Sequence, residues 1–237
     1  MDADCEFVRV EKAERLAVVT VDRPPVNAIH NQIRDELGRV FAEIDGALDI
    51  HAVVLTGGPR IFSAGVDIRG LRAAAPSDAV PRNTRYQAIF LSIARVRAPV
   101  IAAVNGYALG GGLELAMACD LRVAASDAFF ALPEINLGGV PGAAGPQRLA
   151  RLVGRGMATR MVVSGERVDA EEAYRIGLVD ELAAPGEAIA RAVELARRIA
   201  GHPPRAVQAC KAAISLGDEL PLERAQAIDR HLLGYAT

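Results

Sequence analysis

The stretch VIAAVNGYALGGGLE, residues 100–114, contains an apolar run, a glycine-rich turn and the start of a helix. Its first five residues are apolar without alternation, which is typical of a strand buried on both faces. Glycines carry no Cβ, so they let backbone N–H groups approach a ligand oxygen closely. A second stretch has the same plan, because the apolar run 52–56 is followed by the turn FSAGVDI at residues 62–68. Two such turns on neighbouring strands can direct two N–H groups at one point, as an oxyanion hole requires.

The order of the expected elements indicates an α/β protein with a helical end. Strand and helix patterns alternate up to Leu132, and helical spacing dominates after Pro141. Recurring strand–turn–helix units favour stacked sheets. The expected strands are 7–11, 16–21, 52–56, 100–104, 121–125, 128–132 and 178–182. The expected helices are 31–48, 83–96, one from the triple glycine to Cys119, 147–153, 156–163, 170–176, 188–200, 204–216 and 222–233, and residues 71–81 are expected to form a mobile surface segment.

Composition and charge argue against several classes of protein. The formal net charge is −2 and the pI is about 6.1, so no surface for nucleic acid or anionic membrane is expected. No window reaches the roughly 20 apolar residues of a membrane span, and the acidic N-terminus does not resemble a signal peptide. Three widely spaced cysteines form no metal-ligand cluster with the four histidines. We therefore expect a cytoplasmic protein without a metal site.

Two acidic residues are candidates for acid–base chemistry. Glu114 lies in the first turn of the helix that begins at the triple glycine, where an anion is favoured, and it either caps that helix or reacts. Glu134 follows a predicted strand in LPEI, residues 132–135, and is either a solvated carboxylate in a turn or a second reactive group. If the two converge beside the aimed N–H donors, one can act on water while the other delivers a proton.

Other catalytic motifs find no support in the sequence. The glycines at 106 and 110–112 do not form GxGxxG, and no GK[ST] follows them, so neither a dinucleotide site nor a P-loop is indicated. Ser63 is not part of a GxSxG elbow, and no histidine is placed to suggest a catalytic triad.

Several segments resemble the enoyl-CoA hydratase/isomerase (crotonase) family. The most specific is NGYALGGGLELAMACD at 105–120, and the others follow the family's order and spacing over nearly the whole chain. These others are PPVNAI at 24–29, FSAGVDI at 62–68, PEINLGGVPGAAG at 133–145 with QRL at 147–149, and SGERVDAEEAYRIGLVD at 164–180.

The resemblance implies the fold and the ligand. The implied fold is α/β, a crotonase (ClpP/crotonase-like) fold of repeated ββα units with stacked sheets, with the core at 1–184. A helical C-terminal region at 185–237 would mediate trimerisation, giving a homotrimer or a dimer of trimers. Family members usually continue into another amphipathic helix that packs over the acyl-CoA site. The sequence ends at Thr237, so either this helix is absent, which would leave the CoA site more open, or the sequence is incomplete. The ligand would be an acyl-CoA thioester, and coenzyme A enters as part of that substrate, so no separate cofactor is expected.

Site residues are also implied by the resemblance. Glu114 and Glu134 match the two catalytic carboxylates of the hydratases, with Glu114 as base on water and Glu134 as proton donor to C2. The oxyanion-hole N–H groups would belong to Ala64 and Gly111. The residues expected to contact substrate or CoA are Ser63, Ala64, Val66, Asp67, Ile68 and Gly110, and the acyl pocket could draw on Leu71, Ile89, Leu113, Ile135 and Leu137, each of which could equally be core.

The implied activity is hydration of trans-2-enoyl-CoA to 3-hydroxyacyl-CoA, a hydro-lyase reaction of fatty acid β-oxidation. Two alternatives are open. One is a Δ3,Δ2-enoyl-CoA isomerase in which Glu134 alone moves the proton, and the other is an acyl-CoA-binding homologue without turnover. The presence of both Glu114 and Glu134 favours the hydratase.

Overall fold

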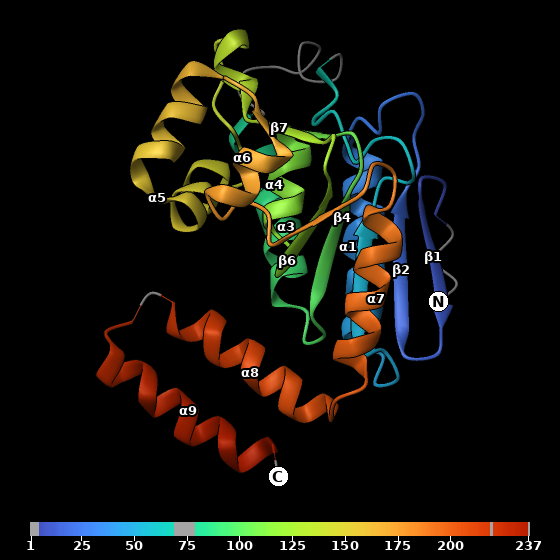
Figure 1. Ribbon diagram of the computed structural model, residues 1–237, viewed down its shortest axis with the longest axis vertical. Coiled ribbons are helices and arrows are strands. Elements are labelled where there is room, and N and C mark those ends of the chain that lie inside the picture. The colour runs from blue at the N-terminus through green and yellow to red at the C-terminus, as the bar shows by residue number, and fades with distance from the viewer. Residues whose placement is uncertain (1–4, 69–78, 219, 237) are drawn as a thin grey trace.

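The computed structural model describes residues 5–68, 79–218 and 220–236, and it contains two sheets with helices around them (Figure 1). The larger sheet has the order β1-β2-β3-β4-β6-β9, in which β1 and β2 pair antiparallel and the other neighbours pair parallel. The smaller sheet has the order β5-β7-β8. The strands are β1 Val8–Ala13, β2 Leu16–Val21, β3 Ala52–Thr56, β4 Val100–Val104, β5 Tyr107–Leu109, β6 Leu121–Ala125, β7 Phe129–Ala131, β8 Val168–Asp169 and β9 Glu181–Ala183.

Helices cover both faces of the larger sheet. Strands β3 and β4 are buried along their whole length, because alternate side chains enter two separate apolar clusters. On one face α1 and α3 pack over Val53 and Leu55, and on the other α7 packs over Val54 (Figure 1). The helices are α1 Asn31–Gly46, α3 Ala79–Arg95, α4 Gly111–Met117, the 3-10 helix η2 Pro133–Leu137, α5 Gly145–Ser164, α6 Ala170–Arg175, α7 Ala188–Ala200, α8 Pro204–Gly217 and α9 Leu222–Ala236.

The two glycine-rich turns lie side by side at the ends of neighbouring strands. Because β3 and β4 pair parallel, the segments that follow them leave the sheet at the same edge. Backbone hydrogen bonds then join the turns: Ser63 N–H donates to the carbonyl of Tyr107 at 3.1 Å, and Leu109 N–H donates to the carbonyl of Ser63 at 3.0 Å. The prediction that both turns come together at one place is confirmed at the level of the backbone.

Helices α8 and α9 form an arm at the C-terminal end of the chain, apart from the two sheets in Figure 1. They pack on each other, and α8 has no buried residue, so apolar side chains such as Ile214, 75% exposed, face outward. An ion pair joins the arm to the core: Lys211 Nζ lies 2.6 Å from Asp120 Oδ2 and donates to the carbonyl of Ala98 at 3.1 Å.

Most predicted elements are present, and the differences are local. The two helices expected at 147–153 and 156–163 are the two parts of α5, and the backbone between them is non-helical at Gly154, where φ is +78°. The last strand is 181–183 rather than 178–182, and the short elements β5, β8 and η2 were not predicted. The surface segment expected at 71–81 lies largely outside the described residues. None of the described helices is long and apolar enough to cross a membrane.

Candidate active site

Glu114 is held on α4 by backbone amides from another part of the chain. Its side chain is 1% exposed, and Oε1 accepts hydrogen bonds from Ala143 N–H at 2.7 Å and Gly145 N–H at 2.9 Å. These amides belong to the turn that leads into α5, the helix that packs against α4. A Cβ on Gly145 would lie 2.7 Å from Oε1, so glycine is required for this close approach.

Burial changes the acidity of Glu114. Loss of solvent raises its pKa to about 7, and the nearby charge of Glu134 adds to the rise. The hydrogen bonds from the two backbone amides favour the ionised form and therefore oppose this rise in the pKa. Near neutral pH this carboxyl group is therefore present in both protonation states, as a group that exchanges protons during a reaction requires.

Glu134 lies in the first turn of η2 and is the second carboxylate of the site. Its Oε2 is buried without a hydrogen-bond partner among the described residues, and burial raises its pKa. A Cβ on Gly110 would lie 2.7 Å from Glu134 Oε1, so the triple-glycine turn passes directly beside this carboxylate. A buried oxygen without a partner is costly, so this arrangement favours a protonated carboxyl or a ligand at that position.

Both carboxylates face one cavity of about 570 Å³. The size is within the range of small-molecule sites, and the walls combine apolar and polar groups in the way such sites do. The lining includes Arg34, Ala64, Val66, Ile68, Asn83, Tyr86, Gly110, Glu114, Pro133, Glu134, Asn136, Leu137, Gly139, Val140 and Gly142. The structure therefore brings together the two acidic residues and both glycine-rich turns.

One of the two expected oxyanion-hole donors needs correction. Ala64 N–H donates to the carbonyl of Val26 at 2.9 Å, so it is occupied within the protein and the prediction for Ala64 is wrong. Among the described residues, the N–H groups of Val66 and Gly111 have no recorded acceptor. A Cβ on Gly111 would lie 3.4 Å from Val66 N, so these two N–H groups lie close together beside the cavity.

The residues expected to contact CoA divide into two groups. Ala64, Val66, Ile68 and Gly110 line the cavity. Ser63 does not, because its side chain is buried and its hydroxyl donates to the carbonyl of Asn27 at 2.8 Å and accepts from Gly65 N–H. That prediction is therefore wrong, and the Ser63 hydroxyl stabilises the turn.

Asp67 is ion-paired with Arg23 at 2.9 Å and is not among the cavity-lining residues. A contact between Asp67 and CoA remains a prediction.

Tyr86 and Arg34 line the cavity but lie outside the sequence motifs described above. Tyr86 projects from α3 and is 3% exposed, and the Arg34 guanidinium from α1 lies 4.1 Å from its ring centroid. Helical spacing places both residues on the inner faces of their helices, but that pattern does not separate a core residue from a cavity residue.

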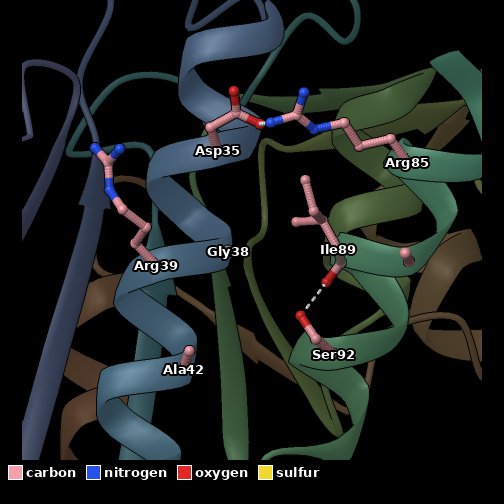
Figure 2. Close-up of a pocket in the computed structure, with 8 residues that line it drawn as sticks. Asp35, Gly38, Arg39, Ala42, Arg85, Ile89 and Ser92 are labelled. Atoms are coloured by element: carbon pink, nitrogen blue, oxygen red, sulfur yellow. Dashed lines mark hydrogen bonds and ion pairs between the residues drawn. The ribbon is translucent and has the colours of Figure 1, made fainter.

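A second hollow of about 580 Å³ lies between α1 and α3, and Figure 2 shows its walls. An ion pair between Asp35 and Arg85, 2.7 Å apart, connects the two helices across it. Ile89, one of the residues weighed for the acyl pocket, lines this hollow instead, and Ser92 Oγ donates to its carbonyl. The hollow contains neither candidate carboxylate, so it is separate from the candidate active site.

The remaining acyl-pocket candidates also differ in position. Leu113 is fully buried in the core, Leu137 lines the cavity, and Ile135 is exposed. Leu71 lies outside the described residues. Within the described part of the chain, no cluster of three or more His, Cys, Asp or Glu side chains is arranged to hold a metal ion.

Comparisons with known proteins agree with this architecture. A sequence model of the Enoyl-CoA hydratase/isomerase family matches residues 11–237. The short-chain-enoyl-CoA hydratase of Clostridium acetobutylicum is 40% identical over 96% of this chain and 88% of its own length. The crotonyl-CoA hydratase of Syntrophomonas wolfei is 38% identical over 97% of this chain and 89% of its own.

A solved structure of enoyl-CoA hydratase from Bacillus anthracis superposes with a TM-score of 0.93 at 31% identity, covering 97% of this chain and 90% of that one. The fold is therefore the crotonase fold that the sequence predicts. The chain belongs to the enoyl-CoA hydratase/isomerase family.

Proposed function

We propose that this protein is an enoyl-CoA hydratase, which adds water reversibly across the double bond of trans-2-enoyl-CoA to give 3-hydroxyacyl-CoA. The observation that carries the proposal is the pair of carboxylates facing one cavity with raised pKa values, of which Glu114 is buried and Glu134 is half-buried. Groups with perturbed pKa values in a cleft are typical of acid–base sites. The names of the relatives support the same activity.

The thioester carbonyl binds where two backbone N–H groups are available. In this proposal Val66 N–H and Gly111 N–H donate to the carbonyl oxygen and draw electron density from the conjugated double bond. C3 becomes electrophilic, and the negative charge that develops on oxygen as the enolate forms is stabilised. Such preorganised donors are worth about 10² to 10³ in rate each.

Water then adds in a step that the two carboxylates share. Ionised Glu114 accepts a proton from a water molecule whose oxygen forms a bond to C3, and the electron pair of the double bond moves onto the thioester as an enolate. Protonated Glu134 gives its proton to C2 as the enolate collapses. The cycle leaves Glu114 protonated and Glu134 ionised, so transfer of one proton from Glu114 to Glu134 through solvent restores the starting state.

The other features of the assignment follow from this substrate. The residues Ala64, Val66, Ile68 and Gly110 are proposed to lie along the acyl-CoA, and Asp67 is proposed to contact the CoA moiety. The reaction needs no cofactor beyond the CoA of its substrate. We propose a cytoplasmic homotrimer or dimer of trimers with a catalytic core at 1–184, assembled through the helical region 185–237.

The test is hydration of crotonyl-CoA and of a long-chain trans-2-enoyl-CoA, followed as loss of the absorbance of the conjugated thioester. Glu114→Gln and Glu134→Gln should each slow hydration by about 10² to 10⁴-fold while binding of acyl-CoA persists. Glu43→Gln is the matched control, because Glu43 is an exposed glutamate on α1.

Three outcomes would contradict parts of this proposal. Near-normal turnover in either active-site variant would remove the role given to that carboxylate. Conversion of 3-enoyl-CoA by wild type without hydration would identify an isomerase, and saturable binding without either reaction would identify a binding protein.

A further inference from the structure

The Tyr86 hydroxyl lies beside the two backbone N–H groups of the proposed oxyanion hole. A Cβ on Gly111 would lie 2.3 Å from Tyr86 Oη, 2.8 Å from Val66 Cγ2 and 3.4 Å from Val66 N. One small volume next to Gly111 is therefore bordered by a phenol oxygen and a backbone nitrogen. Tyr86 lines the same cavity as Glu114 and Glu134, and it is 3% exposed.

This hydroxyl is available to a ligand. Its recorded hydrogen bond runs to the carbonyl of Gly111 at 3.4 Å, which is long for an O–H···O bond, where about 2.5 to 3.0 Å is usual. A buried hydroxyl that has only a long bond gains by donating to a better-placed acceptor. A thioester oxygen bound between Val66 N–H and Gly111 N–H would be such an acceptor.

The surroundings keep the phenol protonated and its ring in place. Burial raises the pKa of Tyr86 well above its usual value, and the charges of Glu114 and Glu134 act in the same direction. The ring packs edge-on against Phe90 with a centroid separation of 4.4 Å, and the Arg34 guanidinium lies over it. The positive charge of Arg34 opposes the rise in the pKa of Tyr86, so it makes the O–H group a better donor than burial alone would leave it.

We propose that the Tyr86 hydroxyl is a third donor of the oxyanion hole, in addition to Val66 N–H and Gly111 N–H. This inference rests on the proposed hydratase function. When the bond from water oxygen to C3 forms, the electron pair displaced toward the thioester oxygen is stabilised by the Tyr86 O–H dipole. The hydroxyl keeps its proton throughout, and the proton that reaches C2 still comes from Glu134. Tyr86 is thus a catalytic residue that no sequence motif marks.

The decisive variant is Tyr86→Phe, which removes the oxygen and keeps the ring. Removal of one oxyanion donor typically costs about 10² to 10³ in rate, so kcat for crotonyl-CoA hydration should fall by roughly 10²-fold. KM should change much less, because the added stabilisation develops mainly in the transition state. Tyr174→Phe is the matched control, because Tyr174 on α6 is 54% exposed, and its kcat should equal that of wild type.

A second measurement does not depend on turnover. Donors that polarise a conjugated thioester shift its absorbance to longer wavelength, so a bound 2,4-dienoyl-CoA should show a smaller shift in Tyr86→Phe than in wild type. Thermal unfolding of both variants establishes that each is folded. An unchanged kcat, or an unchanged spectral shift in folded Tyr86→Phe, would overturn the proposal. A rise in KM alone would reduce Tyr86 to a residue that shapes the acyl pocket.

The two proposals fail in different ways. If wild type hydrates crotonyl-CoA and Tyr86→Phe does so equally well, the hydratase assignment stands and the third donor does not. If wild type has no hydratase activity, the assignment fails. The spectral shift of the bound dienoyl thioester then still decides whether Tyr86 donates to the carbonyl.

Discussion

Gly145→Ala places one methyl group against the carboxylate that the mechanism uses as a base. The new Cβ would lie 2.7 Å from Glu114 Oε1 and 3.0 Å from Glu114 Cγ. Gly145 is the first residue of α5 and its backbone does not need a positive φ, so alanine is acceptable to the main chain itself. The closest contact is with Glu114, and Pro141 Cβ, 3.0 Å from the new Cβ, limits a shift of the methyl group, so we expect Glu114 to move away from Ala143 N–H and Gly145 N–H.

The magnitude follows from the bonds that are disturbed. A hydrogen bond to a charged group contributes roughly 1.5 to 3 kcal/mol, and each 1.4 kcal/mol is a factor of ten in an equilibrium. Loss of one such bond therefore lowers the ratio of ionised to protonated Glu114 by about ten-fold or more. Displacement of a catalytic group by 1 Å costs about 10²-fold in rate. We expect a loss of about 10² to 10³ in kcat/KM at neutral pH.

The assay is hydration of crotonyl-CoA from pH 5 to 9, with Gly156→Ala as control. A Cβ on Gly156 of the same helix α5 would meet no atom within 4 Å. The control should hydrate normally and gain up to about 1 kcal/mol in stability from its better helix propensity. Gly145→Ala should lose activity. The acid limb of its pH profile should move to higher pH, because weaker hydrogen bonds from the two backbone amides raise the pKa of Glu114. If both variants show the same kcat/KM and the same pH profile, the amides do not control Glu114 and the reasoning is wrong.

Three further results are expected. In wild type, kcat/KM should decline as pH falls through about 7, because Glu114 must be ionised to accept a proton, and this limb should disappear from the residual activity of Glu114→Gln. In the folded state Glu114 keeps its proton up to about pH 7, whereas its ordinary pKa is 4.5. The free energy of unfolding of wild type therefore falls as the pH rises from 4.5 to 7. Unfolding at pH 8 should show Glu114→Gln more stable by up to about 3 kcal/mol, and this difference should vanish below pH 4.5. Lys211→Met leaves Asp120 without its cation and should lower the free energy of unfolding by about 3 kcal/mol, whereas Lys12→Met at an exposed position should change it by less than about 0.5 kcal/mol.

The strands, turns and carboxylates that form the site can be predicted from the sequence, because each is marked by a local pattern of residues. The unbroken apolar runs of β3 and β4 indicate strands buried on both faces, and parallel pairing brings the turns after them together. Glu114 is placed by the glycines that start α4, and Glu134 by the end of β7. Both carboxylates therefore converge on one cavity, as the spacing and the family resemblance implied.

The details that were wrong depend on contacts between distant segments. Pairing with a segment about 40 residues earlier decides which N–H group of the turn 62–68 faces the cavity. Ile29 N–H donates to the carbonyl of Gly65, and Asp67 N–H donates to the carbonyl of Ile29. That register engages Ala64 with Val26 and leaves Val66 available. No local pattern in the turn encodes this choice.

Tyr86 was missed for a related reason. Its helical spacing shows only that it faces inward, and its place beside Gly111 depends on how α3 packs against α1 and the triple-glycine turn. A tyrosine within an apolar helix face is a weak signal, because a buried phenol more often finds a structural partner.

The way Glu114 is held has a consequence for how this protein can change over generations. Its two recorded donors are main-chain amides, which every residue except proline supplies, so replacing the side chain of Ala143 leaves that donor in place. A side chain at position 143 must still be small, because Ala143 is 1% exposed, but the nature of that side chain does not enter the hydrogen bond. The position of the carboxylate therefore depends on the course of the backbone and on the absence of a Cβ at Gly145, and not on a partner side chain that a single substitution could remove.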